Sequence, residues 1–171
     1  KELGINFVII DPYCNCTAST MGDKWIAPRP GTDAALAEAI AYVWLNEGTY
    51  DKWFIENRTF GFEEWKKHIL GEEDGTPRTP EWASRICDIP AHTIQALARQ
   101  WAAKKTMLAV GSIFGATGAC RQAYATEWAR LCVLLMAMQG FGKPGGSMDR
   151  SRQGLIDCIL LRHQDHLAAC P

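Results

Sequence analysis

The feature that most constrains this fold is a short apolar run at 7–10, Phe-Val-Ile-Ile, which stops at Asp11 and Pro12. Aromatic and β-branched residues favour a strand. A continuous rather than alternating apolar run is typical of a strand that is buried on both faces. Such a strand needs helices on both sides of its sheet. We therefore expect a parallel sheet covered by helices, with the Asp11 carboxylate emerging at the edge of the sheet.

The remaining pattern alternates strands and helices. Thr32 or Asp33 can cap a helix that ends at Gly48, and its apolar stripe is Leu36, Ile40, Val43 and Trp44. We predict a strand at 24–28, a polar loop at 12–23, helices at 50–58, 62–70, 79–86 and 89–105, a strand at 106–112, and a last helix at about 119–140. The predicted class is α/β, a Rossmann-like layered fragment with a mostly parallel sheet flanked by helices.

Composition excludes several function classes. The net charge is −1, with basic residues spread along the chain, which argues against a nucleic-acid partner. The longest apolar run, at 131–138, is too short to span a membrane. Seven scattered cysteines do not make a disulfide framework, and reduced thiols are expected. The first ten residues show no signal peptide and resemble a helix end leading into a buried strand, so we expect the chain to be part of a longer one.

Ligands of parallel α/β sheets bind beyond the carboxyl ends of the strands, and Asp11, Gly31 and Gly111 are expected near that edge. The Asp11 carboxylate can accept two hydrogen bonds from a ribose diol or a guanine edge. The alternative is that Asp11 caps the loop before Pro12. The spacing alone leaves both interpretations open.

The turn at 29–33, Arg-Pro-Gly-Thr-Asp, carries more information. Gly31 allows a ligand to approach the backbone, and the helix start offers N–H groups that favour an anion. Arg29 can bind phosphate or carboxylate through its fork of donors. Asp33 would repel a phosphate, so it is better suited to cap the helix or to accept from a purine edge. The alternative is a capped helix with a surface arginine.

Other motifs are weaker. The loop at 111–118 is glycine-rich but lacks the dinucleotide fingerprint and a P-loop lysine. Cys14 and Cys16 form a C-x-C without a second pair. A set of zinc-capable side chains in the tail fits either a zinc site or the polar face of a terminal helix; it comprises Cys158, His163, His166 and Cys170. No set of residues is spaced for nucleophilic catalysis.

Together, the segments 7–65, 70–102 and 106–146 resemble the molybdopterin guanine dinucleotide oxidoreductases of the dimethyl sulfoxide reductase superfamily. The motif "IDP…T…DKWIAPRPGTDAAL" carries most of the resemblance, which covers about residues 5–146. The run from 105 to 145 is most similar to the transhydroxylase-like and reductase-like catalytic subunits.

This resemblance implies a role for the polar residues at the strand ends. The family binds two pyranopterin guanine dinucleotides to one molybdenum or tungsten, and one α/β domain holds a guanosine end. Asp11, with Pro12 beside it, would contact the nucleoside. Arg29 would lie near the diphosphate or the adjoining wall of the site. The remaining implied cofactor contacts are Gly31, Thr32 and Asp33 at the guanine, and Gly111, Ser112 and Arg121 towards the pterin and metal.

The sequence also departs from the family pattern. The loop at 111–121 lacks the Trp-Gly and the Arg or Gln of many relatives, and the iron–sulfur cysteine motif, the segment with the metal ligand and the C-terminal pterin domain are missing. After Gly146 the resemblance ends. We therefore expect a partial cofactor-binding domain at 1–146 and a divergent tail at 147–171.

The expected function is to hold the guanosine end of the cofactor in an enzyme of two-electron oxo- or hydroxyl-transfer chemistry. By itself the chain is expected to be inactive. Its implied partners are the rest of the catalytic subunit and an iron–sulfur electron-transfer subunit. A 4Fe–4S cluster belongs to the missing N-terminal part, and the compartment is the cytoplasm or a bacterial periplasm. The alternative is a truncated, non-catalytic scaffold that binds no cofactor and associates through an exposed sheet edge.

Overall fold

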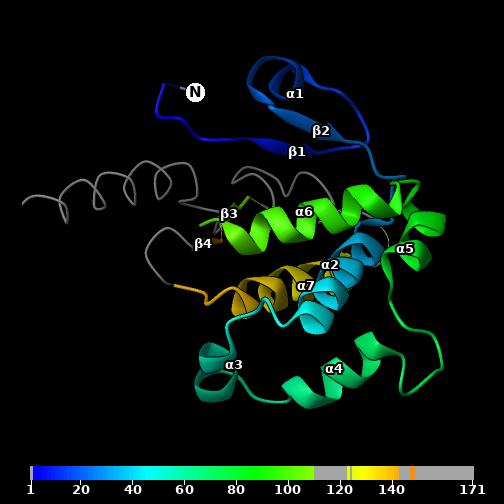
Figure 1. The fold of residues 1–171 in the computed structure, drawn as a ribbon. Helices are drawn as coiled ribbons and strands as arrows, with labels where there is room; N and C mark the ends of the chain where they lie inside the picture. The colour runs from blue at the N-terminus through cyan, green and yellow to red at the C-terminus, as the bar shows by residue number, and fades with distance from the viewer. Residues whose placement is uncertain (1, 110–122, 124, 143–146, 149–171) are drawn as a thin grey trace, which may run out of the picture.

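The computed structural model describes residues 2–109, 123, 125–142 and 147–148. Within them the elements, in chain order, are β1 (Val8–Ile10), α1 (Cys16–Met21), β2 (Lys24–Ile26), α2 (Asp33–Glu47), α3 (Lys52–Arg58), α4 (Phe62–Leu70), α5 (Pro80–Cys87), α6 (Ala91–Ala103), β3 (Met107–Leu108), α7 (Ala125–Met138) and β4 (Ser147–Met148). The fold is mixed α/β and mostly helical (Figure 1).

Helix α2 is the centre of the helical body and packs against α4, α5, α6 and α7. The predicted stripe of Leu36, Ile40, Val43 and Trp44 is buried, which confirms the pattern drawn from the sequence. Five alanines flank this stripe, and four of them are buried, so neighbouring helices approach α2 closely (Ala34, Ala35, Ala37, Ala39, Ala41). The Trp44 indole N–H donates to the carbonyl of Ala98, and its ring meets Trp101 edge-on at 5.1 Å.

The helix-start signals were read correctly at α5. Thr79 accepts a hydrogen bond from the Trp82 N–H, and Pro80 occupies the first helical position. Helix α6 buries the predicted stripe of Ile94, Leu97, Ala98 and Trp101. Helices α3 and α4 fall within the two short ranges predicted for them.

The sheet is smaller than predicted. Strands β1 and β2 pair in parallel, with Val8 opposite Lys24 and Ile10 opposite Ile26. Strands β3 and β4 form a second parallel pair, which is separate from the first among the described residues. The parallel direction is confirmed, while the single larger sheet is not seen in the described part of the chain.

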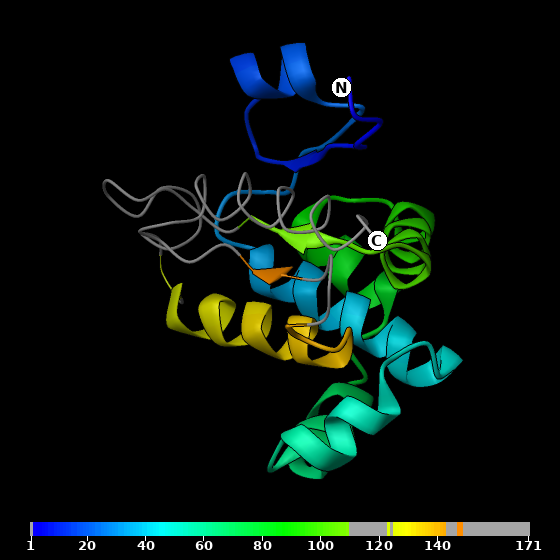
Figure 2. The same cartoon turned by 90° about the vertical axis from the view of Figure 1, so that its left-hand side faces the viewer.

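The expectation that the first strand is buried on both faces is wrong for this structure. Val8 and Ile9 are half-buried, and Ile10 is exposed. The physical reason is that β1 and β2 lie at the edge of the helical body, with Ile26 in the core and Val8 against it, so the described helices do not cover both faces of the strands (Figure 2). The predicted loop at 12–23 also contains α1, because the Asn15 side chain accepts from the Ala18 N–H and starts a short helix.

Other predicted segments fall partly or wholly outside the described residues. Helix α7 confirms the core of the predicted helix at 119–140. The glycine-rich loop at 111–118 and most of the tail after Gly146 are not described. Among the described residues, no helix is long and apolar enough to cross a membrane.

Candidate functional site

The carboxyl ends of β1 and β2 and the beginning of α2 lie towards the same side of the molecule (Figure 1). The parallel pairing of the two strands requires their ends to coincide. Asp11 follows β1, and the turn at 29–32 leads from β2 into α2. Asp11 and Pro12 lie directly after β1, while Arg29, Gly31 and Thr32 come just before Asp33, the first residue of α2. That these residues form one cofactor site stays a prediction.

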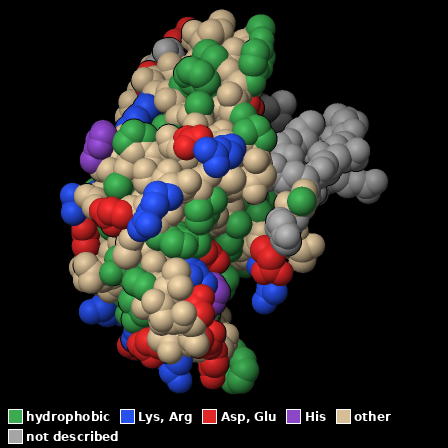
Figure 3. Space-filling model, turned by 90° about the vertical axis from the view of Figure 1, so that its right-hand side faces the viewer, with side chains coloured by type: hydrophobic (Ala, Val, Ile, Leu, Met, Phe, Trp, Pro, Cys, Tyr) green, Lys and Arg blue, Asp and Glu red, His purple; other side chains and the backbone are tan. Residues whose placement is uncertain are grey.

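The surface on this side carries acidic and basic side chains interspersed with hydrophobic ones (Figure 3). In that view neither charge sign forms a continuous field. Binding at such a surface depends on individual hydrogen bonds and ion pairs.

Asp11 is half-buried and holds the loop after β1. Its carboxylate accepts from the Tyr13 N–H at 2.8 Å and from the Asn15 amide at 3.2 Å. Its own N–H donates to the Ile26 carbonyl, which ties β1 to β2. The carboxylate thus performs the capping role that was the alternative interpretation. A carboxylate has about four lone-pair sites, so these two bonds leave acceptor capacity for a ligand.

Trp25 links Asp11 to the second strand. Its indole N–H donates to the Asp11 carbonyl at 2.8 Å, and its side chain is 45% exposed. An exposed aromatic face next to strand ends is a surface on which a planar base can stack. Sequence reasoning missed this residue, although an exposed tryptophan in a strand that leads to a glycine turn was a usable signal.

The turn at 29–32 is held by its own backbone. The Arg29 carbonyl accepts from the Thr32 N–H at 3.2 Å and from the Thr32 hydroxyl at 2.6 Å. Thr32 therefore occupies the N-cap position without capping the helix through its side chain. Gly31 is exposed at φ +80°, and a Cβ there would meet no atom within 4 Å. The backbone of this turn is open to an approaching ligand.

The Arg29 side chain is paired with a carboxylate, that of Asp88. Its Nε and one terminal nitrogen lie 3.0 and 2.6 Å from Oδ2 of Asp88. Its backbone N–H also donates to the Cys87 carbonyl at 2.9 Å. Residues 87 and 88 end α5, so Arg29 joins the turn at 29–32 to the connection between α5 and α6. Asp88 was missed from the sequence, although an acidic residue where a glycine helix stop is usual was visible there.

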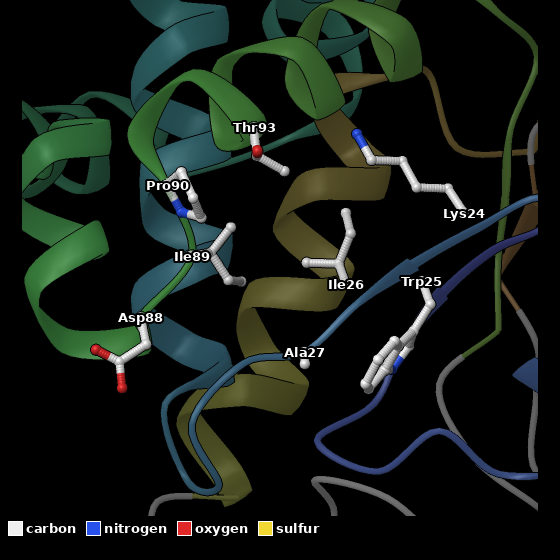
Figure 4. A pocket seen from close by; sticks show the side chains of 8 residues that line it. All are labelled: Lys24, Trp25, Ile26, Ala27, Asp88, Ile89, Pro90 and Thr93. Atoms are coloured by element: carbon white, nitrogen blue, oxygen red, sulfur yellow. The ribbon is translucent and has the colours of Figure 1, made fainter.

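A hollow of about 240 Å³ lies between β2 and the connection from α5 to α6 (Figure 4). Trp25, which bonds to Asp11, and Asp88, which bonds to Arg29, are both part of its lining, and Lys24 lies at the opposite end from Asp88. The other lining residues are Ile26, Ala27, Ile89, Pro90 and Thr93. The hollow is smaller than the roughly 300–1,000 Å³ of sites for drug-sized ligands, which suits one ring system of a larger ligand.

Cys87, next to Asp88 of this hollow, is not a reactive thiol. Cys87 is fully buried, and burial raises the pKa of its thiol, so it stays protonated and unreactive at neutral pH. Cys14 and Cys16 are exposed and free. In the part of the chain that the structure describes, no three His, Cys, Asp or Glu side chains come together as a metal site. The zinc-capable residues of the tail, Cys158, His163, His166 and Cys170, lie outside the described residues.

Three of the predicted cofactor contacts also lie outside the described residues: Gly111, Ser112 and Arg121. The described part of the site consequently consists of carboxylates, an exposed indole, an open glycine turn and an arginine that is already paired. This donor and acceptor set fits a purine nucleoside, whose base edge offers N–H groups to carboxylates and whose face can stack. It offers no free described arginine fork for a phosphate at the turn.

The chain is similar to large enzymes of known name. It is 52% identical over 155 residues to the pyrogallol hydroxytransferase large subunit of Pelobacter acidigallici, which covers 91% of this chain and 18% of that one. It is 40% identical over 152 residues to the dimethyl sulfoxide/trimethylamine N-oxide reductase of Cereibacter sphaeroides, with 88% and 18% covered. The chain thus spans about a fifth of the length of these relatives. No protein-family model matches it.

A solved structure agrees with the sequence relatives. Acetylene hydratase from Pelobacter acetylenicus superposes with a TM-score of 0.67 at 29% sequence identity. The match covers 80% of this chain and 17% of the hydratase. The described fold therefore recurs inside a much larger chain.

Proposed function

Because this chain belongs to the molybdopterin-dependent dimethyl sulfoxide reductase superfamily, we propose that it holds the guanosine end of a pyranopterin guanine dinucleotide. The family implies a molybdenum or tungsten pterin cofactor. The proposed unit comprises residues 1–146 and has a Rossmann-like arrangement, with the tail at 147–171 outside it. The observation that supports the proposal is that β1 and β2 end, and α2 begins, towards the same side of the molecule (Figure 1).

Each residue has a distinct part in the proposed site. The Asp33 carboxylate opens α2 and accepts from the N1 and N2 hydrogens of guanine. Gly31 lets the base approach the backbone, and Trp25 offers a stacking face on the hollow of Figure 4. Asp11, beside Pro12, contacts the ribose with its remaining lone pairs. Thr32 shapes the turn through its bonds to the Arg29 carbonyl.

The metal supplies two-electron oxo- or hydroxyl-transfer chemistry when the cofactor is bound, and the protein supplies binding and orientation. Within the proposal, Gly111, Ser112 and Arg121 extend the site towards the pterin. The rest of a catalytic subunit and an iron–sulfur electron-transfer subunit are the proposed partners. A 4Fe–4S cluster would be held outside these 171 residues.

The names of the relatives support this proposal over the non-catalytic scaffold, since the two sequence relatives are enzymes or subunits of enzymes. The exposed apolar side chains of the β1–α1–β2 unit are also consistent with a larger assembly. They include Tyr13 at 73% and Met21 at 43% exposure.

Titration calorimetry of the 171-residue chain with GMP tests the proposal, with AMP as the control nucleotide. Binding of GMP in preference to AMP is expected, because only guanine presents two adjacent N–H donors to a carboxylate. Equal binding of both nucleotides, or of neither, would contradict it.

The substitution Asp33→Asn sharpens this test. An amide offers one acceptor and one donor, so it no longer matches the two donors of guanine but does match xanthine, which has a carbonyl at C2. We expect the variant to lose GMP binding and to gain binding of xanthosine monophosphate. A variant that binds GMP as tightly as the parent chain would remove Asp33 from the proposed site.

A further inference from the structure

We propose that Asp88 is a positioning residue that holds the turn at 29–32 in its ligand-binding shape through Arg29. The inference rests on the proposed function, because the turn is the part of the site that would receive the guanine. In this arrangement the Arg29 side chain pairs with Asp88 and does not bind a phosphate of the ligand.

Both the side chain and the backbone of Arg29 are bonded to the end of α5. The Arg29 side chain makes two contacts with Asp88 Oδ2, at 3.0 and 2.6 Å, and the Arg29 N–H donates to the Cys87 carbonyl at 2.9 Å. Both partners lie at the end of α5, 58 and 59 positions along the chain. Side chain and main chain of one residue are thus attached to the same distant connection.

Hydrogen bonds connect Arg29 to the beginning of α2. Its carbonyl accepts both the N–H and the hydroxyl of Thr32. The Thr32 carbonyl in turn accepts the N–H groups of Ala35 and Leu36 in the first turn of α2. A shift of Arg29 would therefore be transmitted through hydrogen bonds to the residues on either side of Asp33.

The backbone of Asp88 is left-handed, which is uncommon for a residue with a side chain. Asp88 has φ +61° and is the one non-glycine residue with positive φ in the described part of the chain. Its N–H caps α5 by donating to the Ser84 carbonyl. Glycine is the usual residue at such a helix stop, because a side chain is strained there. Aspartate is one of the few residues with a side chain that adopt this conformation, and here its carboxylate pairs with Arg29.

The substitution Asp88→Gly separates positioning from fold stability. Glycine suits the backbone at φ +61°, so the melting temperature should stay the same or rise, while the carboxylate that holds Arg29 is gone. We expect GMP and unphosphorylated guanosine to bind about twofold to fivefold more weakly, the range of an exposed ion pair. A residue that matters only for the fold would leave binding equal or improved.

The competing role of Arg29 as a phosphate ligand predicts the opposite. If Asp88 merely competed with phosphate for Arg29, Asp88→Gly would bind GMP more tightly and guanosine unchanged. Either of those results would overturn the inference, as would GMP and guanosine binding equal to that of the parent chain.

A double-substitution cycle isolates the pair. Asp88→Asn should weaken GMP binding in the parent chain but have no further effect in an Arg29→Gln background, because the pair is already broken. Additive effects would contradict positioning through Arg29. Glu47→Gln is the matched control, since Glu47 binds Arg99 with the same two-nitrogen geometry at the other end of α2. It should leave GMP binding unchanged.

Amide hydrogen exchange provides a readout that needs no nucleotide. The N–H groups of Thr32, Ala35 and Leu36 should exchange faster in Asp88→Gly, while that of buried Ile94 should not change. If the parent chain binds no GMP, the proposed function fails. Unchanged exchange at residues 32–36 would overturn the positioning role whatever the nucleotide result.

Discussion

The two ends of α2 carry almost the same ion pair in different backbone settings. At the N-terminal end, two nitrogens of Arg29 lie 3.0 and 2.6 Å from one oxygen of Asp88. At the C-terminal end, two nitrogens of Arg99 lie 2.9 and 2.7 Å from one oxygen of Glu47. In both pairs the arginine side chain is more than half exposed.

The difference lies in the main chain behind each pair. Arg99 and Glu47 both belong to regular helices, whose backbone hydrogen bonds exist without the pair. Arg29 lies in a turn and Asp88 at a strained helix stop. The same contact therefore adds a little stability at one end, while at the other it determines the shape of an irregular segment. Contact energy alone does not tell which residues shape a site.

The largest expected effect is at Trp44, a buried residue of α2 that lies in the sequence between Arg29 and Glu47 of the two ion pairs. Trp44→Ala should lower the free energy of unfolding by about 3–5 kcal/mol, because a fully buried indole and its bond to the Ala98 carbonyl are both lost. Urea denaturation followed by circular dichroism measures it. Trp53→Ala is the control, since Trp53 is 58% exposed and its loss should cost far less. Equal costs would mean that α2 is not the centre of the core.

The next effect lies at the middle of α2, where Glu38 meets a buried arginine. Arg78 is 8% exposed, bonds to Asp74 and the Thr76 carbonyl at 2.6 Å, and places its Nε 3.5 Å from Glu38. Arg78→Met should cost about 2–3 kcal/mol, because Glu38 loses a charged partner in a partly buried place. Lys66→Met, which breaks an exposed pair with Glu63, should cost almost nothing. Thermal unfolding of both variants checks the contrast.

The pair between Arg78 and Asp74 has a pH dependence whose sign follows from the pKa of Asp74. The bond from Arg78 lowers the pKa of the Asp74 carboxyl below its ordinary value of about 3.9. A lowered folded-state pKa gives stability that is present above the ordinary value and is lost as pH falls through the folded value. The stability difference between the parent chain and Arg78→Met should therefore shrink below about pH 4. A difference that grows on acidification would contradict this assignment.

The helices could be read from the sequence because local signals and packing agree there. The stripe of Leu36, Ile40, Val43 and Trp44 and the Thr79–Pro80 start required only helical periodicity and capping chemistry. Strand burial could not be read in the same way. The run at 7–10 is apolar enough for two covered faces, but what covers a strand is decided by other parts of a structure, and Ile10 is exposed here.

The residues of the candidate site also differ in whether local sequence signals point to them. Asp11, Gly31 and Asp33 could be proposed from the sequence because strand ends and helix starts are local features, and the parallel pairing of β1 with β2 agrees with that reading. Asp88 and Trp25 were missed because their roles depend on partners 59 and 14 positions away. The prediction that Arg29 lies near the diphosphate or the adjoining wall of the site stays untested, although its observed partner is a carboxylate.

A smaller effect tests the turn at the N-terminal end directly. Gly31→Ala should cost about 1 kcal/mol, because alanine is strained at φ +80° while its Cβ meets no atom within 4 Å. Gly75→Ala is a matched control, with φ +70° and equally open surroundings in the connection between α4 and α5. The two variants should lose similar stability in urea, and only Gly31→Ala should weaken GMP binding. Equal GMP binding by both would remove the turn from the site.

The smallest effect compares the two ion pairs themselves. Glu47→Gln and Asp88→Asn each remove one charge from an exposed pair, so each should change the free energy of unfolding by less than about 1 kcal/mol. Stability should therefore not distinguish the two ends of α2. Hydrogen exchange should distinguish them, because the amides of Glu47 and Gly48 keep their helical and capping bonds, the latter to the Trp44 carbonyl. The Thr32 amide depends on where Arg29 is held. Faster exchange at both ends, or at neither, would show that the backbone setting of an ion pair does not decide its structural role in this molecule.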